Sequence, residues 1–497
     1  MTPHFSRSVR PRLATLLATG AVGVYLLVAI GATTALTDAA AACSGWPVCG
    51  VEGRLGEPLV WIALGHRAVA GLVGTVLVLC GLLAWHGDGT PRRVKAALAV
   101  ALGLYPLQVA IGALAATSEF AWVPGAHLTV GMTIFAGVVV ALGWELEANT
   151  AETPETDLPN AGVSAGTGTG AGAGNETGVT PAGSPSVDTA LADTTPVSPS
   201  SSAGRGGRVA GFRRTFGAYV SLTKPRLMWL LCLVAAAAMA LAAGPALEAR
   251  TVVLTLAGGV LAIGASGTFN HVLERDVDRR MNRTSDRPLA VDEVSVTNAL
   301  VFGFSLALAS LAVFAQVNLL AAVLGLVAIT FYSVIYTLVL KPNTVQNTVL
   351  GGAAGALPAL IGWAAVTGGL DLPGVLLALV IFLWTPAHFY NLALAYKDDY
   401  ERGGFPMLPV VRGEAVTRRH VLWYLGATLL TAVALAALAE LGWVYAAATV
   451  SVGGIFLWAV VKLHRERTTQ AAFRAFHASN AYLGVVLLAI VVDALVL

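Results

Sequence analysis

Long apolar stretches dominate this sequence, and they constrain its fold more than any other feature. Thirteen segments of about 20 residues carry few or no charges, and this length crosses the hydrocarbon core of a bilayer as an α-helix. Charged residues make up only 12% of the chain, against roughly 25% in soluble domains. The sequence therefore predicts an all-α, polytopic membrane protein embedded in the lipid bilayer. The net charge of +2 and the lack of a basic domain exclude nucleic acid as an expected partner.

The expected helices fall into two groups. Four lie near residues 13–36, 59–84, 95–116 and 124–146, and nine near 227–246, 251–271, 296–317, 319–340, 345–366, 372–395, 420–440, 443–463 and 473–496. The segment between the groups is rich in Ala, Gly, Ser, Thr and Pro and contains no Lys or Arg, a composition that cannot offset the entropy of ordering. We predict a four-helix membrane domain (1–147), a disordered linker (148–204) and a nine-helix membrane bundle (205–497).

The basic residues predict an orientation. With thirteen spans and the N-terminus inside, all but three of the 30 Lys and Arg residues face the cytoplasm, the exceptions being Arg54, Arg67 and Arg250. Because positive charge collects on the cytoplasmic side, we expect a protein of the cell membrane with a cytoplasmic N-terminus and an outer C-terminus.

The most charged stretch runs from Asn270 to Pro288, directly after an apolar run. Asn270, Glu274 and Asp278 are spaced four residues apart, so on one helix their oxygen side chains share a face. This set suits Mg²⁺, which takes oxygen ligands and usually keeps substrate phosphates as further ligands. A solvated charge cluster is the alternative that the spacing alone leaves open.

A second charged segment, Lys397-Asp-Asp399-Tyr400, ends the sixth helix of the nine-helix group. In the predicted orientation it emerges on the same cytoplasmic side as Asn270–Asp278. Two carboxylate clusters with Lys and Arg between them suit a diphosphate held by Mg²⁺, and an apolar tunnel between helices would hold a hydrocarbon tail. We therefore expect the active site at this membrane face.

Several ordered motifs carry a resemblance. They are Tyr219-Val-Ser-Leu-Thr-Lys-Pro-Arg226, the Asn270–Pro288 stretch, Tyr332…Lys341, Asn347…Pro358, Pro386-Ala-His388 and Phe405-Pro-Met-Leu-Pro. Together these motifs extend over about 280 residues. They resemble the UbiA-type intramembrane prenyltransferases and, within that class, the protohaem IX farnesyltransferases. The resemblance implies transfer of the farnesyl group of farnesyl diphosphate to a vinyl group of haem B, giving haem O.

The resemblance also implies roles for individual residues. Asn270, Glu274, Asp278 and Asp399 would coordinate Mg²⁺ and the diphosphate, and the cations that would neutralise the phosphates are Arg226, Arg283, Arg287, Lys341 and Lys397. Two departures leave the number of metal ions open, because Glu274 replaces an aspartate and Gly403 stands where a further acid often follows Asp399. A quinone-pathway aromatic prenyltransferase and a non-catalytic haem-handling membrane protein are the alternatives.

His388 lies within an apolar helix, where an ionisable side chain is a functional candidate. It either contacts haem or forms a hydrogen bond to a neighbouring helix. The four-helix domain carries His66 and His127 near the outer ends of its second and fourth helices. Such a pair either ligates one haem iron or consists of two core histidines.

The four-helix domain resembles one half of a haem A synthase. The resemblance rests on the loop Cys43-Ser-Gly-Trp-Pro-Val-Cys49, on Gln108-Val-Ala-Ile-Gly-Ala and on Ala126-His127-Leu. It implies a haem-binding module, with a haem A synthase or a second copy of this chain as partner. Ala63 stands where this family tends to carry a glutamate, which counts against full oxidase activity. Cys43 and Cys49 either form a disulfide outside the cytosol or remain free thiols.

Overall fold

The computed structural model describes residues 6–36, 46–47, 49, 58–87, 89–118, 120–148 and 205–496. The predicted linker lies outside this range except for Ala148. Within the described residues, thirteen helices are long and apolar enough to cross a membrane, which confirms the predicted all-helical class. Met1–Glu152 and Thr215–Leu497 group into one compact unit.

The first four membrane helices are α1 (Ser6–Leu36), α2 (Pro58–His86), α3 (Arg92–Thr117) and α4 (Val123–Ala148). The other nine spans are α6 (Pro225–Ala243), α7 (Ala249–Leu273), α9 (Val296–Ala315), α10 (Leu319–Thr330) with the π-helical η3 (Phe331–Leu340), α12 (Asn347–Thr367), α13 (Leu372–Ala395), α16 (Glu414–Leu438), α17 (Trp443–Glu466) and α18 (Thr469–Val496). Most boundaries fall within a few residues of the predicted ones, although α16 begins at Glu414 instead of near residue 420. The π-helical stretch was not predicted.

Local sequence explains where several helices begin and end. The Ser295 hydroxyl accepts a hydrogen bond from the Asn298 N–H at 3.2 Å and caps α9, and Asn318 caps α10 through the Ala321 N–H at 2.7 Å. Such side chains satisfy N–H groups that the first helical turn leaves unpaired. Gly368, with a φ of 69°, ends α12 in the left-handed conformation that glycine adopts without strain.

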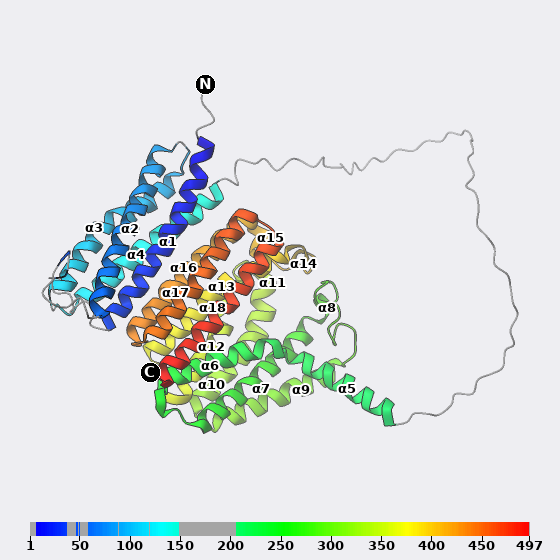
Figure 1. Ribbon diagram of the computed structural model, residues 1–497. Helices are drawn as coiled ribbons and strands as arrows, with labels where there is room; N and C mark the ends of the chain where they lie inside the picture. Colours follow the sequence, from blue (N-terminus) through cyan, green and yellow to red (C-terminus); the bar gives the residue numbers. More distant parts are fainter. Residues whose placement is uncertain are drawn as a thin grey trace, which may run out of the picture. The chain divides into compact units, whose positions relative to one another are not determined.

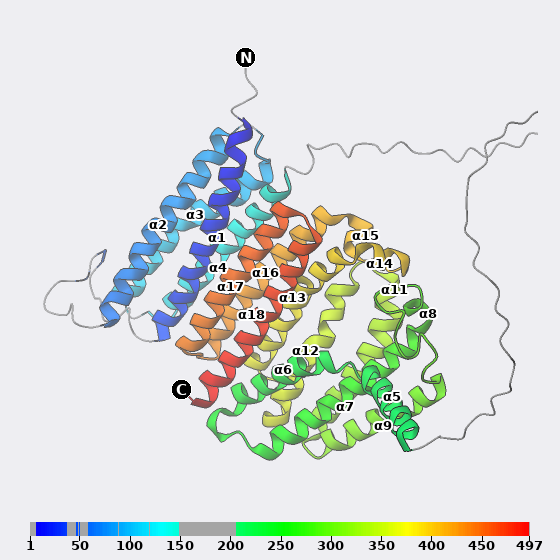
Figure 2. The same cartoon turned by 45° about the vertical axis from the view of Figure 1, so that its right-hand side comes forward.

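The short helices gather near one end of the long ones (Figures 1 and 2). They are α8 (Arg275–Asp278), α11 (Lys341–Asn343), α14 (Lys397–Arg402) and α15 (Leu408–Arg412). The basic helix α5 (Arg205–Leu222) precedes α6. Both charged motifs identified in the sequence therefore belong to this end of the helices.

One apolar core continues from the first four helices into the later ones. It includes Leu17 of α1, Phe135 of α4, Leu425 of α16 and Leu457 of α17, each almost fully buried. Tyr25 of α1 donates a hydrogen bond to the Thr449 carbonyl of α17 at 3.1 Å. The two predicted membrane domains thus share a packed interface within the compact unit.

Candidate active site

The three oxygen-bearing side chains predicted to bind metal lie at the end of α7. The spacing predicts one continuous helix, but α7 ends at Leu273 and Asp278 belongs to the separate α8. The Glu274 N–H still donates to the Asn270 carbonyl at 2.9 Å, and the Asp278 N–H to the Glu274 carbonyl at 2.8 Å. The three residues therefore stay one turn apart, and all are buried, at 2–6% exposure.

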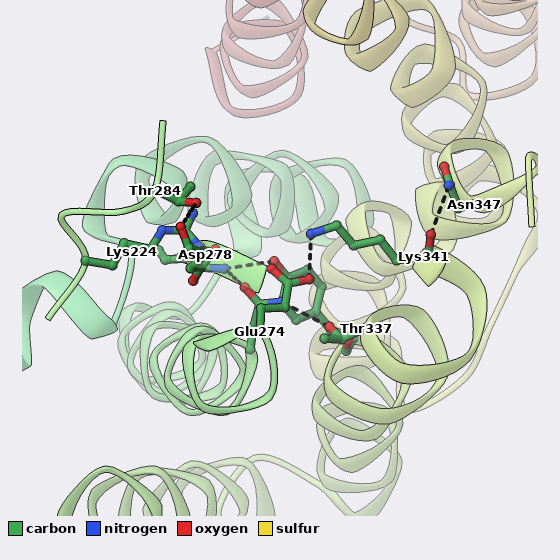
Figure 3. A network of polar contacts seen from close by, with 10 residues as sticks. Lys224, Glu274, Asp278, Thr284, Thr337, Lys341 and Asn347 are labelled. Carbon is green, nitrogen blue, oxygen red and sulfur yellow. Dashed lines mark hydrogen bonds and ion pairs between the residues drawn. The ribbon is translucent and has the colours of Figure 1, made fainter. Parts of the chain in front are cut away.

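Each of these side chains is bonded to a cation (Figure 3). Lys341 Nζ lies 2.5 Å from Glu274 Oε1. Arg287 Nη1 lies 2.9 Å from both carboxylate oxygens of Asp278. Lys224 Nζ donates to Asn270 Oδ1. Acids and cations thus form one buried network in which both signs of charge are available to a ligand.

Burial and pairing act in opposite directions on these groups. Burial raises the pKa of Glu274, but Lys341 and Lys224 outweigh it, so that the net pKa lies below its usual value. For Asp278, burial raises the pKa more than Arg287 lowers it. Burial lowers the pKa of Lys224 to about 8, although Glu274 partly counteracts this effect. Lys224 is therefore a cation that loses its charge unusually close to neutral pH.

Asp399 of α14 has a different set of partners. Its Oδ1 accepts from the Asn282 N–H and from Arg402 Nη2, both at 2.9 Å, and its Oδ2 accepts from the Arg283 N–H at 3.4 Å. Asp399 thus holds the loop that follows α8. Across the part of the chain that the structure describes, no group of three or more His, Cys, Asp or Glu is placed to hold a metal ion.

The remaining predicted cations are spread around this network. The Arg283 guanidinium lies over the rings of Tyr396 and Tyr400, 5.4 and 5.6 Å from their centroids. Lys397 pairs with Glu414 at 3.3 Å, and Arg226 is exposed near the start of α6. Of the five predicted cations, Lys341 and Arg287 contact the α7–α8 acids directly.

An apolar pocket adjoins the network. Its walls come from α6, α7, α9, α10, α12 and η3, and they include Leu227, Leu231, Gly259, Ile263, Phe314 and Pro358. Lys224 and Tyr332 also line it, and Lys224 Nζ lies 3.3 Å from the Tyr332 hydroxyl. The pocket therefore has a polar end, marked by Lys224, that touches Asn270.

Sequence reasoning did not assign Lys224 to the site. The signal was a lysine just before Pro225, where an apolar run begins. Lys224 adopts φ 56° and ψ 56°, a left-handed conformation that costs energy for a residue other than glycine. This backbone conformation, together with the Asn270 contact, directs its ammonium group into the network.

His388 does not line this pocket. Its ring stacks between Trp384 and Phe476, with centroid distances of 4.3 and 4.4 Å. Its Nδ1 lies 2.6 Å from the Ser479 hydroxyl. The structure thus places His388 in a packed aromatic cluster with a hydrogen-bond partner on α18.

His66 and His127 lie in the first four helices, and the Nδ1 atom of each is buried and has no hydrogen-bond partner among the residues that the structure describes. His127 Nε2 lies 3.2 Å from Gln108 Nε2, so α3 also contributes to this polar spot. Cys49 is disulfide-bonded, whereas Cys43, its predicted partner, lies outside the described residues.

Known proteins resemble this chain over nearly its whole length. Residues 230–484, just over half of the chain, match the UbiA prenyltransferase family, so the chain is of the intramembrane prenyltransferase class. A "Protoheme IX farnesyltransferase" of Haloarcula marismortui is 60% identical over 97% of this chain and 98% of its own. The chain therefore belongs to the protohaem IX farnesyltransferase family.

Two further comparisons cover less of the chain. A "Protoheme IX farnesyltransferase 1" of Saccharopolyspora erythraea is 45% identical over 57% of this chain and 92% of its own, so a relative with that name matches only part of it. A solved UbiA homologue from Archaeoglobus fulgidus, bound to DMAPP and Mg²⁺, is 17% identical, with a TM-score of 0.42 over 54% of this chain and 98% of its own.

Proposed function

We propose that this protein transfers the farnesyl group of farnesyl diphosphate to a vinyl group of haem B and so makes haem O. One structural observation carries the proposal: the polar end of an apolar pocket meets a buried network of acids and cations at Lys224 and Asn270. A prenyl diphosphate has the same division into an apolar chain and a charged head. We infer that the acceptor is haem B (protohaem IX) from the names of the relatives.

Mg²⁺ fits the residues at the end of α7. Asn270, Glu274 and Asp278 offer an amide oxygen and two carboxylates in one buried network, and Mg²⁺ is commonly held by one or two carboxylates together with substrate phosphates. These three side chains would hold the ion. Bound there, it would offset the negative charge that develops on the departing diphosphate. Asp399 would act indirectly, through the loop it holds.

The protein's cations would act on the diphosphate itself. Lys224, Lys341 and Arg287 surround the acids, and each can turn from its present partner to a phosphate oxygen. The bond between C1 of the farnesyl group and the diphosphate oxygen breaks, and its electron pair leaves with the diphosphate. The haem vinyl group then forms a bond to C1. Water adds to the resulting carbocation and loses a proton, which leaves a hydroxyl group.

A mass spectrum of extracted haem tests this activity. Membranes containing the protein are incubated with haem B, farnesyl diphosphate and Mg²⁺. A gain of one farnesyl group plus one hydroxyl group, absent when Mg²⁺ is chelated, is the expected result. An unchanged haem mass, with farnesyl transferred to a quinone precursor instead, would contradict the haem acceptor and retain only the class of reaction.

We also propose that the first four helices bind haem through His66 and His127. The support is their two buried, unpartnered Nδ1 atoms, since metal-ligating histidines need a free ring nitrogen. His127 and Glu147 lie about 30 Å apart along α4, at about 1.5 Å per residue. The proposed haem site therefore lies toward the start of α4, and Glu147 lies near its end. Haem titration should give a bis-histidine absorption spectrum in the wild type that His66→Ala and His127→Ala each abolish; unchanged spectra in both variants would contradict the proposal.

The end of the helices that carries the acids is proposed to face the cytoplasm, because most Lys and Arg residues belong to that end. Ser285 is exposed in the loop after α8. In a background with all four native cysteines (Cys43, Cys49, Cys80 and Cys232) replaced, Ser285→Cys should react with a membrane-impermeant thiol reagent in inside-out vesicles and not in intact cells. The reverse pattern would overturn the orientation.

A further inference from the structure

A chain of ion pairs links the first four helices to the active-site loop. It begins at Glu147 near the end of α4 and passes through Arg418 and Glu414 of α16 to Lys397 of α14. Lys397 lies two residues before Asp399, which holds the loop after α8. The established family activity assigns no role to this path.

The first link is buried and well formed. Arg418 Nε lies 2.8 Å from Glu147 Oε1, and Arg418 Nη2 lies 3.2 Å from Glu147 Oε2. Each side chain is only 4% exposed. His464 Nε2 of α17 lies 3.7 Å from Glu147 Oε1. A bidentate arginine–carboxylate pair fixes orientation as well as distance, so α4 and α16 are held in one register.

Apolar contacts also join α4 and α16, so their adhesion does not depend on the ion pair alone. A Cβ at Gly426 of α16 would lie 2.9 Å from Val139 of α4, and Trp144 packs edge-on against Trp423 with centroids 6.0 Å apart. Buried ion pairs often add little net stability compared with apolar contacts, and their best-attested role is to specify register. The Glu147–Arg418 pair therefore has a different role from that of its neighbours.

The following links run toward the diphosphate site. Arg418 Nη1 lies 3.5 Å from Glu414 Oε2, and Glu414 Oε1 lies 3.3 Å from Lys397 Nζ. Glu414 thus divides its two oxygens between the buried arginine and α14. If Glu147 lost its charge, Glu414 would be the remaining carboxylate partner of Arg418. Glu414 would then shift toward Arg418, and Lys397 would lose its ion-pair partner.

We infer that Arg418 is a positioning residue through which the four-helix domain sets the place of α14 and, by way of Asp399, of the loop that carries Arg283 and Arg287. The path ends at the Arg287–Asp278 pair of the active site. Energetic coupling between sites is carried by ion-pair and packing networks of this kind; here the first link is buried, and the Glu414 and Lys397 side chains of the last link are 45% and 35% exposed. The inference rests on the proposed diphosphate site.

Equilibrium binding of farnesyl diphosphate with Mg²⁺ to the purified full-length protein tests the inference without the haem acceptor. Glu147→Gln and Glu414→Gln should each raise Kd at least about five-fold, the lower end of typical coupling between sites. The double variant should be no weaker than the weaker single variant, because both changes break one path. An unchanged Kd in folded Glu147→Gln, or additive effects, would overturn the coupling.

Two further variants separate positioning from mere stability. Glu466→Gln removes an exposed, ion-paired acid at the end of α17 that also carries His464. It should leave Kd within about two-fold of the wild-type value. The exchange Glu147→Arg with Arg418→Glu restores a buried pair but repels Glu414, so it should fold and still bind weakly; a wild-type Kd there would also overturn the inference. If the wild type itself binds no farnesyl diphosphate, the proposed function fails, and the inference fails with it.

Discussion

At the scale of single residues, the site depends on side chains that are buried and paired before any ligand is bound. Lys224 combines three properties: a left-handed backbone, a place on the pocket wall and a bond to Asn270. Asp278 combines burial with a contact in which both of its carboxylate oxygens lie 2.9 Å from Arg287 Nη1. Both residues lie where a diphosphate head would meet the protein, and both lead to direct tests.

Lys224 should give diphosphate binding a pH limb near 8. Its pKa is lowered to about 8, first by burial, so the ammonium charge is present below that pH and is lost above it. Affinity for farnesyl diphosphate should therefore fall as pH rises through about 8, in a titration from about pH 7 to 9.5. Lys224→Arg keeps its charge and should lack this limb. A limb that persists in Lys224→Arg would assign it to another group.

Asp278→Asn should leave a folded protein with little transfer activity. The change removes a carboxylate proposed to hold Mg²⁺ and leaves Arg287 without its acid. Loss of one preorganised electrostatic group typically costs about 10²- to 10³-fold in kcat, and haem O formation per mole of folded protein measures it. Asp292→Asn, which breaks the exposed pair with Arg279, is the control. Full turnover by Asp278→Asn would refute the metal site.

At the scale of elements, small residues let α6, α7 and α12 approach closely and leave space for the pocket. A Cβ at Gly362 of α12 would overlap the Ala235 carbonyl oxygen of α6, so these two backbones touch. Gly259 of α7 also lines the pocket, but a Cβ there meets no atom within 4 Å. A larger side chain should therefore cause a clash at Gly362 and should be accommodated at Gly259.

Gly362→Ala should destabilise the protein by about 1–3 kcal/mol, the usual cost of overpacking, because a backbone carbonyl cannot rotate away. Gly454→Ala on α17 has open space around it and should change stability by less than about 0.5 kcal/mol. Chemical unfolding in detergent compares the two variants. Equal stability would mean that α6 and α12 separate at little cost.

Gly259→Phe should shorten the prenyl chain that the protein accepts. The new ring would project from a position that accepts a Cβ atom and would occupy space in the pocket. Transfer from farnesyl diphosphate should fall, whereas transfer from the ten-carbon geranyl diphosphate should be retained, as product mass spectra would show. An equal loss for both substrates would indicate that the chain lies elsewhere.

At the scale of the whole molecule, the sequence predicts the positions of the helices better than the contacts between them. Hydropathy located all thirteen spans, because each must satisfy its backbone internally. The spacing and charge that group Asn270, Glu274 and Asp278 into one predicted site are local in the sequence. Asp399 is predicted to join them at the metal, and its contacts with the Asn282 and Arg283 N–H groups depend on a chain separation that no local pattern encodes.

The same reason explains what sequence reasoning missed. Lys224 reaches Asn270 only after α6 and α7 have packed together, and Glu147 reaches Arg418 across 271 positions. The linker composition predicts two membrane domains, but it does not encode the contacts that group Met1–Glu152 and Thr215–Leu497 into one compact unit. Long-range pairing follows from packing, which single-sequence patterns do not contain.

The network at the end of α7 is close to electrical balance, and this has a consequence for how substrate enters. Two carboxylates, Glu274 and Asp278, face three cations, Lys224, Lys341 and Arg287, which leaves a surplus of one positive charge. A bare prenyl diphosphate would reverse that surplus, and uncompensated charge is costly where water is scarce. A diphosphate that arrives with its divalent ion carries far less charge. A diphosphate that brought its divalent ion would exchange counterions with the three cations, and Asn270, Glu274 and Asp278 would then hold that ion.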